Sequence, residues 1–145
     1  MPRMLDMIRK VESGELPPPP VAALIGFRLT SVEPGVATLK LEVGPRHANP
    51  MGTLHGGILC DLADAAMGMA WASTLDEGET FTTLELKINF LKPVWAGTLV
   101  ATGRVVGAGR TIGLTESDVV DSKNRLVARA TSTVMTLRGE AAAGR

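Results

Sequence analysis

The chain has 145 residues, a length that fits one domain with one main core. Its 15 Lys and Arg residues balance its 15 Asp and Glu residues, so the formal net charge is zero. A nucleic-acid-binding protein normally carries a basic excess, and no stretch approaches the roughly 18 apolar residues that a membrane span requires. We therefore expect neither nucleic acid nor membrane as a partner, whereas a phosphate-bearing small ligand and self-association stay open.

Cysteine usage bears on the compartment. The single cysteine, Cys60, cannot form an internal disulfide, so nothing indicates an oxidising environment. No basic segment followed by a long apolar run opens the chain. The prediction is a cytoplasmic location.

Residues 1–24 predict an N-terminal arm outside the main domain. A short helix is expected at residues 2–12, with a weak apolar stripe made of Met4, Leu5, Ile8 and Val11. Pro17 to Pro20 exclude a helix interior or a central strand, so they indicate a polyproline spacer that crosses the domain surface.

Residues 27–33 and 36–43 predict two strands joined by a turn at Pro34-Gly35. The second segment alternates apolar and polar residues, which is the period of a half-buried strand. Residues 44–55 lack periodicity and carry glycine and proline, so they predict a loop, a common place for functional residues.

The one long helix candidate runs from Gly56 to about Leu75. On a helical wheel, the side around Asp64 holds Gly57, Cys60, Asp61, Met67, Gly68 and Trp71. The opposite side holds Ile58, Leu59, Leu62, Ala66, Met69 and Ala70. Because apolar residues cover most of the circumference, we expect this helix to be largely buried.

The rest of the chain predicts four further strands, at residues 80–91, 98–106, 111–120 and 126–137. Strict alternation in the first of them would place Leu84, Leu86, Ile88 and Phe90 on one face. It would place Thr83, Glu85, Lys87 and Asn89 on the other face. Residues 138–145 are expected to form a flexible tail.

The predicted fold class is α+β. Two strands, one buried helix and four strands leave no second helix for right-handed crossovers, so the sheet should be mainly antiparallel. We expect residues 25–137 to form a curved antiparallel sheet of about six strands wrapped around the central helix.

Three features could carry chemistry. His55-Gly56-Gly57 stands at the start of the helix, where free backbone N–H groups can bind a carbonyl oxygen as negative charge develops on it. Asp64 is a carboxylate on a buried helix, suited to act as a base or a nucleophile. Asn49 could orient a water molecule or an oxyanion. Each has a structural alternative: a tight turn, an exposed aspartate near the helix start, and ordinary turn chemistry before Pro50.

Other kinds of site are not favoured. His47, His55 and Cys60 lack the spacing of a zinc cluster. The sequence has no G-x-S-x-G elbow and no phosphate-binding loop. We therefore expect no metal.

The stretch HANPMGTLHGGILCDLAD at 47–64, the run LKINFLKP at 86–93 and the turn at Gly109-Arg110 together resemble a known family. They resemble the hotdog-fold acyl-CoA thioesterases, in the phenylacetate-pathway (PaaI-like) branch of the 4-hydroxybenzoyl-CoA thioesterase superfamily. The resemblance extends from about Ile25 to Leu137. It implies hydrolysis of acyl-CoA without a cofactor, because CoA is part of the substrate.

The resemblance also implies residue roles. The Gly56 N–H would polarise the thioester carbonyl, and Asp64 would be the general base or the nucleophile. Asn49 would help to hold the carbonyl or the water, and His55 would mainly shape the loop. A hydroxyl on the following strand would orient the water; this is Thr83, with Thr82 as the fallback because alternation puts Thr83 on the polar face.

The implied site lies between two subunits, which requires a dimer and favours a dimer of dimers. Substrate contacts are expected from Gly57, Met67, Gly68 and Trp71, with Arg110 as the first choice among Arg110, Lys92 and Arg104 for the CoA phosphates. Asp61 adds a second carboxylate on the Asp64 side of the helix and would raise one apparent pKa of the pair.

Two other functions stay open. One is a non-catalytic module that binds or senses acyl-CoA. The other is a hotdog enoyl-CoA hydratase or dehydratase, in which His55 would serve as the base.

Overall fold

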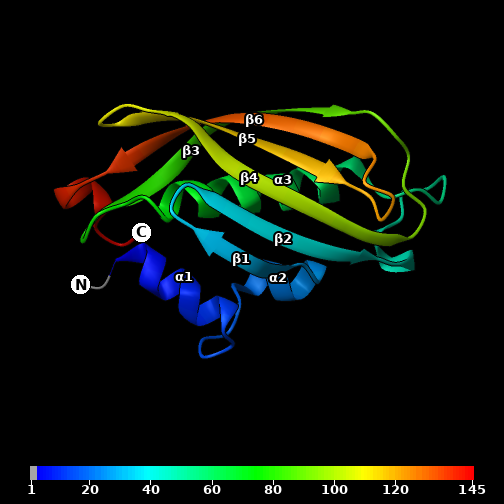
Figure 1. Ribbon diagram of the computed structural model, residues 1–145, viewed down its shortest axis with the longest axis horizontal. Coiled ribbons are helices and arrows are strands. Elements are labelled where there is room, and N and C mark those ends of the chain that lie inside the picture. Colours follow the sequence, from blue (N-terminus) through cyan, green and yellow to red (C-terminus); the bar gives the residue numbers. More distant parts are fainter. Residues whose placement is uncertain (1–2) are drawn as a thin grey trace.

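Six antiparallel strands wrap around one long helix in the computed structural model, which describes residues 3–145 (Figure 1). The helices are α1 (Met4–Glu12), α2 (Pro20–Ile25) and α3 (Gly56–Ala72). The strands are β1 (Arg28–Glu33), β2 (Val36–Val43), β3 (Thr80–Phe90), β4 (Gly97–Ala108), β5 (Ile112–Val120) and β6 (Leu126–Leu137). The predicted α+β architecture is confirmed.

The strand order in the sheet is β1-β2-β4-β5-β6-β3. Every neighbouring pair is antiparallel. The strands β1 and β3 therefore form the two edges, although β3 follows α3 directly in the chain. None of the helices in residues 3–145 has the length and hydropathy needed to cross a membrane.

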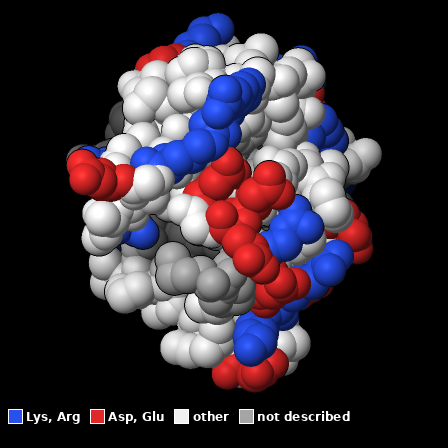
Figure 2. Space-filling view, turned by 90° about the vertical axis from the view of Figure 1, so that its left-hand side faces the viewer, with Lys and Arg blue, Asp and Glu red and all other residues white. Residues whose placement is uncertain are grey.

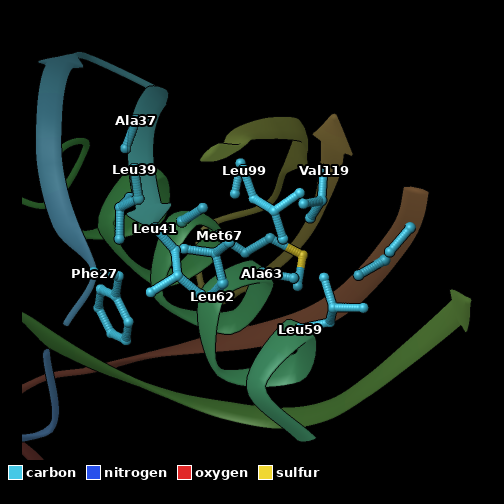
Figure 3. Packing of buried hydrophobic residues seen from close by; sticks show 14 of the residues in the cluster. Phe27, Ala37, Leu39, Leu41, Leu59, Leu62, Ala63, Met67, Leu99 and Val119 are labelled. Carbon is cyan, nitrogen blue, oxygen red and sulfur yellow. The ribbon is translucent and has the colours of Figure 1, made fainter. Parts of the chain in front are cut away.

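The core lies between α3 and the concave face of the sheet (Figure 3). Leu62 and Met67 of α3 are completely buried against strand residues such as Leu39, Leu99 and Val119. Each large apolar side chain buried in this way contributes roughly 1.5–3 kcal/mol of transfer free energy. The core thus fixes the rotation of α3 about its own axis.

Close approach of the helix requires a glycine in β4. A Cβ atom on Gly103 would overlap the backbone of Ala66 and Met67 in α3. Any larger residue would move the helix away from the sheet. The position of α3, and with it the position of Asp64, depends on this contact.

The strand β3 differs from the predicted alternation. A β-bulge at Leu84 shifts the register, so Thr83 pairs with Val134 and Glu85 pairs with Thr133. Directly paired residues share a face, and Val134 is completely buried. Thr83 therefore faces the helix, and the prediction that it lies on the outer polar face is wrong. An inserted residue reverses the alternation on one side of a bulge.

Short helical segments lie toward both ends of the described residues 3–145. The predicted first helix is present as α1, but Pro20 begins the unpredicted short helix α2, a position where proline's missing N–H costs nothing. In the expected tail, Gly139–Ala142 forms a 3₁₀ helix. Just before it, the Arg138 Nε donates to Glu79 Oε1 at 2.6 Å.

Candidate functional site

The start of α3 is capped by the side chain of His55. The Gly57 N–H donates to Nδ1 of His55 at 2.8 Å. A Cβ atom on Gly57 would lie 2.9 Å from that same Nδ1, so glycine is needed for this cap. Because its N–H is already engaged, Gly57 supports the loop and offers no free backbone donor, and the substrate contact expected of it stays a prediction.

Gly56 presents the free donor at this helix start. Within residues 3–145 its backbone N–H makes no hydrogen bond. It lines a cavity of about 390 Å³ together with Leu54, Leu59 and residues 90–94 at and after the end of β3, which include Phe90 and Lys92. A Cβ atom on Gly56 would lie 2.9 Å from Cζ of Phe90, so the ring packs directly against the glycine. An unpaired N–H at a helix start can stabilise a developing oxyanion.

The Asn49 side chain is used within its own loop. Its Oδ1 accepts from the N–H groups of Met51 at 2.9 Å and Thr53 at 3.2 Å. Its Nδ2 donates to Oγ1 of Thr53 at 2.7 Å. The amide thus closes the turn that precedes His55, and one Nδ2 hydrogen is left for another acceptor.

Asp64 and Thr83 lie together between α3 and β3. Both line an apolar cavity of about 300 Å³ whose other residues are Met4, Ile8, Ala65, Gly68, Met69, Ala72 and Phe81. Both also line a second recess of about 320 Å³, which holds Cys60, Asp61 and Glu85. The two residues therefore form the boundary between an apolar space and a space rich in carboxylates.

Burial raises the pKa of the Asp64 carboxyl, and the nearby negative charge of Asp61 raises it further. Burial also raises the pKa of Asp61. The pKa of the Cys60 thiol is raised by burial and by both carboxylates, which keeps the thiol protonated and unreactive. Such a carboxyl can accept a proton at a higher pH than an exposed aspartate can.

Gly56 and Asp64 do not share a cavity within one chain. They are eight positions apart in α3, about 12 Å along a helix with a rise of 1.5 Å per residue. A reacting carbonyl needs its nucleophile and its oxyanion donors within ~3 Å. Within one chain, the carboxylate of Asp64 and the free N–H of Gly56 therefore stand at two separate places.

Several predicted substrate contacts lie elsewhere. Met67 is completely buried in the core. Trp71 is buried against Gly113 and donates to Oγ1 of Thr136. Thr82 pairs with Met135 on the outer face of the sheet, away from Asp64. Of the predicted pocket residues on α3, Gly68 alone lines the cavity beside Asp64.

The apolar cavity contains residues that the sequence did not single out for substrate binding. Ala65 and Met69 come from α3, Phe81 comes from β3, and Met4 and Ile8 come from α1. Phe81 lies on the same face of β3 as Thr83. Strict alternation had assigned that face to the polar side of the strand, so its position toward the helix was not predicted. The contribution of α1 could not be read from a pattern, because nothing in the sequence says where the arm docks.

The predicted cations are widely spread. Arg104 is engaged with Glu116 and Asp118. Lys92 lines the cavity beside Gly56. Arg110 lies in the β4–β5 turn, at the end of the molecule opposite the loop that precedes α3 (Figure 1). Figure 2 shows acidic and basic side chains intermingled on the end that carries this turn, without one large basic surface.

A metal site is not apparent either: nowhere in residues 3–145 do three or more His, Cys, Asp or Glu side chains gather in a geometry suited to a metal ion.

Comparisons with known proteins show which family the chain resembles. The family model described as "Thioesterase superfamily" matches residues 51–128. The 1,4-dihydroxy-2-naphthoyl-CoA hydrolase of Listeria monocytogenes is 32% identical over 103 residues, which are 71% of this chain and 84% of that protein. Human acyl-coenzyme A thioesterase 13 is 30% identical over 103 residues, 70% of this chain and 73% of that protein.

Solved structures of similar proteins have the same fold. A phenylacetic acid degradation-related protein from Ralstonia eutropha has a TM-score of 0.81 and 30% identity, covering 88% of this chain and 98% of that one. The PaaI protein of E. coli has a TM-score of 0.82 and 26% identity, covering 94% and 97% of the two chains.

Proposed function

Because the chain belongs to the thioesterase superfamily, we propose that it hydrolyses acyl-CoA thioesters at a site built jointly by two copies of the chain. One observation carries the proposal: Asp64 and the unpaired N–H of Gly56 line different cavities of one chain. A second copy can bring the missing half to each site.

The edge strand β3 supports this assembly. Among residues 3–145 it pairs only with β6, so its other edge carries unpaired backbone groups. Three apolar side chains on or just after β3 are more than half exposed: Leu84 (52%), Phe90 (54%) and Leu91 (53%). Open, apolar edges are ready to pair with another strand. Pairing of β3 with β3 of a second copy would cover this edge.

Two-fold symmetry gives such a pairing a useful register. In an antiparallel pair related by a two-fold axis, the start of one strand lies opposite the end of the other. Thr83, beside Asp64, is near the start of β3, and Phe90, beside Gly56, is its last residue. The carboxylate of one copy would therefore approach the free N–H of the other copy.

The chemistry follows from these groups. Water attacks the thioester carbon while Asp64 accepts the proton, or the carboxylate itself attacks and water releases the acyl group in a second step. The Gly56 N–H of the second copy stabilises the negative oxygen in either route. Thr83 orients the water, and the C–S bond breaks to release CoA and the free acid. The chain's own groups suffice, so the proposal includes no cofactor.

The His55 cap argues against a hydratase. Its Nδ1 lone pair already accepts the Gly57 N–H, so the neutral ring carries its proton on Nε2 and has no free lone pair for a base. A binding module without catalysis is disfavoured by the carboxylate with a raised pKa at a cavity boundary, an arrangement that is typical of functional sites.

The proposal extends to assembly and location. Val106, Ile112 and Leu114 near the β4–β5 turn are exposed and could be covered in a dimer of dimers. We also propose a cytoplasmic location, where an acyl-CoA pool would be met.

A thiol-release assay tests the proposed activity. The purified chain is incubated with a panel of aliphatic and aromatic acyl-CoAs, and free CoA is measured. We expect turnover with several thioesters and no hydrated product from an enoyl-CoA. Tight binding without thiol release would favour a binding module, and a hydroxyacyl product would favour a hydratase.

A further inference from the structure

We propose that α1 forms the wall of the acyl-binding cavity, and that Ile8 and Met69 determine how long an acyl group the cavity accepts. The inference rests on the proposed function, because it assigns the acyl half of the thioester to a particular space. It adds a specificity-determining residue, Ile8, from the N-terminal arm, which lies outside the matched family region at residues 51–128.

The cavity beside Asp64 is closed on one side by the arm. Met4 and Ile8 of α1 face Ala65, Gly68, Met69 and Ala72 of α3 across about 300 Å³. Asp64 and Thr83 are the only polar residues in its lining. An apolar space with its polar groups on one side suits a ligand that is reactive at one end and hydrocarbon beyond.

The neighbouring recess indicates which way the substrate is oriented. It shares Asp64 and Thr83 with the apolar cavity, but it also holds Asp61 and Glu85. The recess is also lined by Leu84 and Leu86, but its carboxylates make it a less favourable place for hydrocarbon than the apolar cavity, where burial gains roughly 0.8 kcal/mol per methylene. With the thioester carbon at Asp64, the acyl group therefore points toward α1.

A second apolar cavity continues beyond the first. It measures about 420 Å³ and is lined by α1 and the proline segment: Met7, Ile8, Val11, Leu16, Pro17, Pro18, Pro19 and Pro20, together with Met69. Ile8 and Met69 are the two residues that line both cavities. They stand as a partition between a space for a short or medium acyl group and the space that a longer chain would need.

The arm is held firmly enough to act as a wall. Leu5 of α1 is buried in the main core at 7% exposure. Ion pairs join Arg9 to Glu33 at 3.4 Å and Arg3 to Asp76 at 3.6 Å. These ion pairs are exposed and individually weak, so Leu5 and the apolar stripe supply most of the attachment.

Chain-length preference tests the partition. Hydrolysis and binding are measured for hexanoyl-, octanoyl-, dodecanoyl- and palmitoyl-CoA, with non-hydrolysable thioether analogues for the binding titrations. We expect the wild-type chain to prefer the shorter groups. Ile8→Ala and Met69→Ala should each raise the dodecanoyl-to-octanoyl ratio of kcat/KM by about tenfold or more, as expected for opening an apolar pocket by a few carbon atoms.

Two further variants keep the test specific. Ala72→Leu fills the first cavity and should shift the preference in the opposite direction, toward hexanoyl-CoA. Asp6→Ala is the control, because Asp6 lies exposed on the same helix and lines neither cavity. It should leave the ratio unchanged. Thermal melting confirms that each variant is folded.

The results separate the two proposals. Folded Ile8→Ala and Met69→Ala chains with an unchanged length preference, in both hydrolysis and thioether binding, would overturn the partition while leaving the activity intact. A chain that binds the thioethers with the expected shifts but cleaves no thioester would retain the partition and overturn the proposed function.

Discussion

Asp64 on α3 and Thr83 on β3 line the same two cavities, one apolar and one rich in carboxylates. Their proximity depends on the extra residue Leu84, which turns the Thr83 side chain toward the helix. A base with a raised pKa and a hydroxyl that can hold water are thereby brought to one boundary. The following predictions test what each group contributes.

Replacing Asp64 by Asn should lower kcat by about 10²–10⁴-fold, the usual loss when a general base is removed. The amide keeps the size of the side chain, so the fold should persist. Asp61→Asn is the matched control, since Asp61 lines only the carboxylate-rich recess. It should keep kcat within a few-fold near neutral pH. Thiol release from octanoyl-CoA measures both, and equal losses in the two variants would contradict the assignment.

The pH profile should report the coupling between the two aspartates. Activity requires ionised Asp64, so kcat/KM should fall as the pH drops through its raised pKa. The negative charge of Asp61 contributes to that rise. Asp61→Asn should therefore lower the pKa of Asp64 and move the acid limb of the profile to lower pH. If the acid side of the profile in Asp61→Asn stays in place or moves to higher pH, the charge of Asp61 does not raise the pKa of Asp64.

The same raised pKa predicts a stability effect. The folded state holds the Asp64 proton more tightly than the unfolded state does, so stability falls as the pH rises from the unfolded pKa through the folded pKa. Asp64→Asn removes this penalty. Urea denaturation should show the variant to be more stable than the wild type at neutral pH, and the difference should vanish at a pH below the unfolded pKa. If Asp64→Asn is instead less stable than the wild type at neutral pH, the ionised Asp64 side chain stabilises the folded state, which would contradict this prediction.

Thr83 and Thr82 form a matched pair on opposite faces of β3. Thr83→Val keeps the shape of the side chain and removes the hydroxyl, so we expect a loss in kcat of about tenfold, as for one hydrogen bond of ~1.4 kcal/mol. Thr82→Val should have little effect on kcat, because that side chain lies on the outer face. Steady-state kinetics of both variants decide whether the bulge serves the reaction.

The sequence predicted the fold well because its evidence was local. The strand segments, the single buried helix and its start at Gly56 follow from periodicity and from glycine placement. The bulge in β3 was missed because one inserted residue leaves no mark on composition. Strict alternation therefore placed Thr83 on the wrong face.

The helix α3 shows a second limit of prediction from the sequence. A helical wheel gives angles between residues, but it does not say which arc the sheet covers. In the structure, the sheet covers the side of α3 that carries Met67 and Trp71, whereas α1 lies beside the side that carries Ala65 and Met69. The predicted pocket residues Met67 and Trp71 are consequently buried in the core, whereas Met69, which the wheel placed on the opposite side, lines the cavity with Gly68.

Complementation between two inactive chains tests the shared site most directly. Asp64→Asn removes the base, and Gly56→Ala places a Cβ atom 2.9 Å from Phe90 and disturbs the donor at the helix start. When the two variants are co-expressed, a mixed dimer has one site with both groups intact. With random pairing, we predict recovery of about a quarter of the wild-type kcat. A mixed preparation that forms dimers and remains as inactive as either parent would contradict the account.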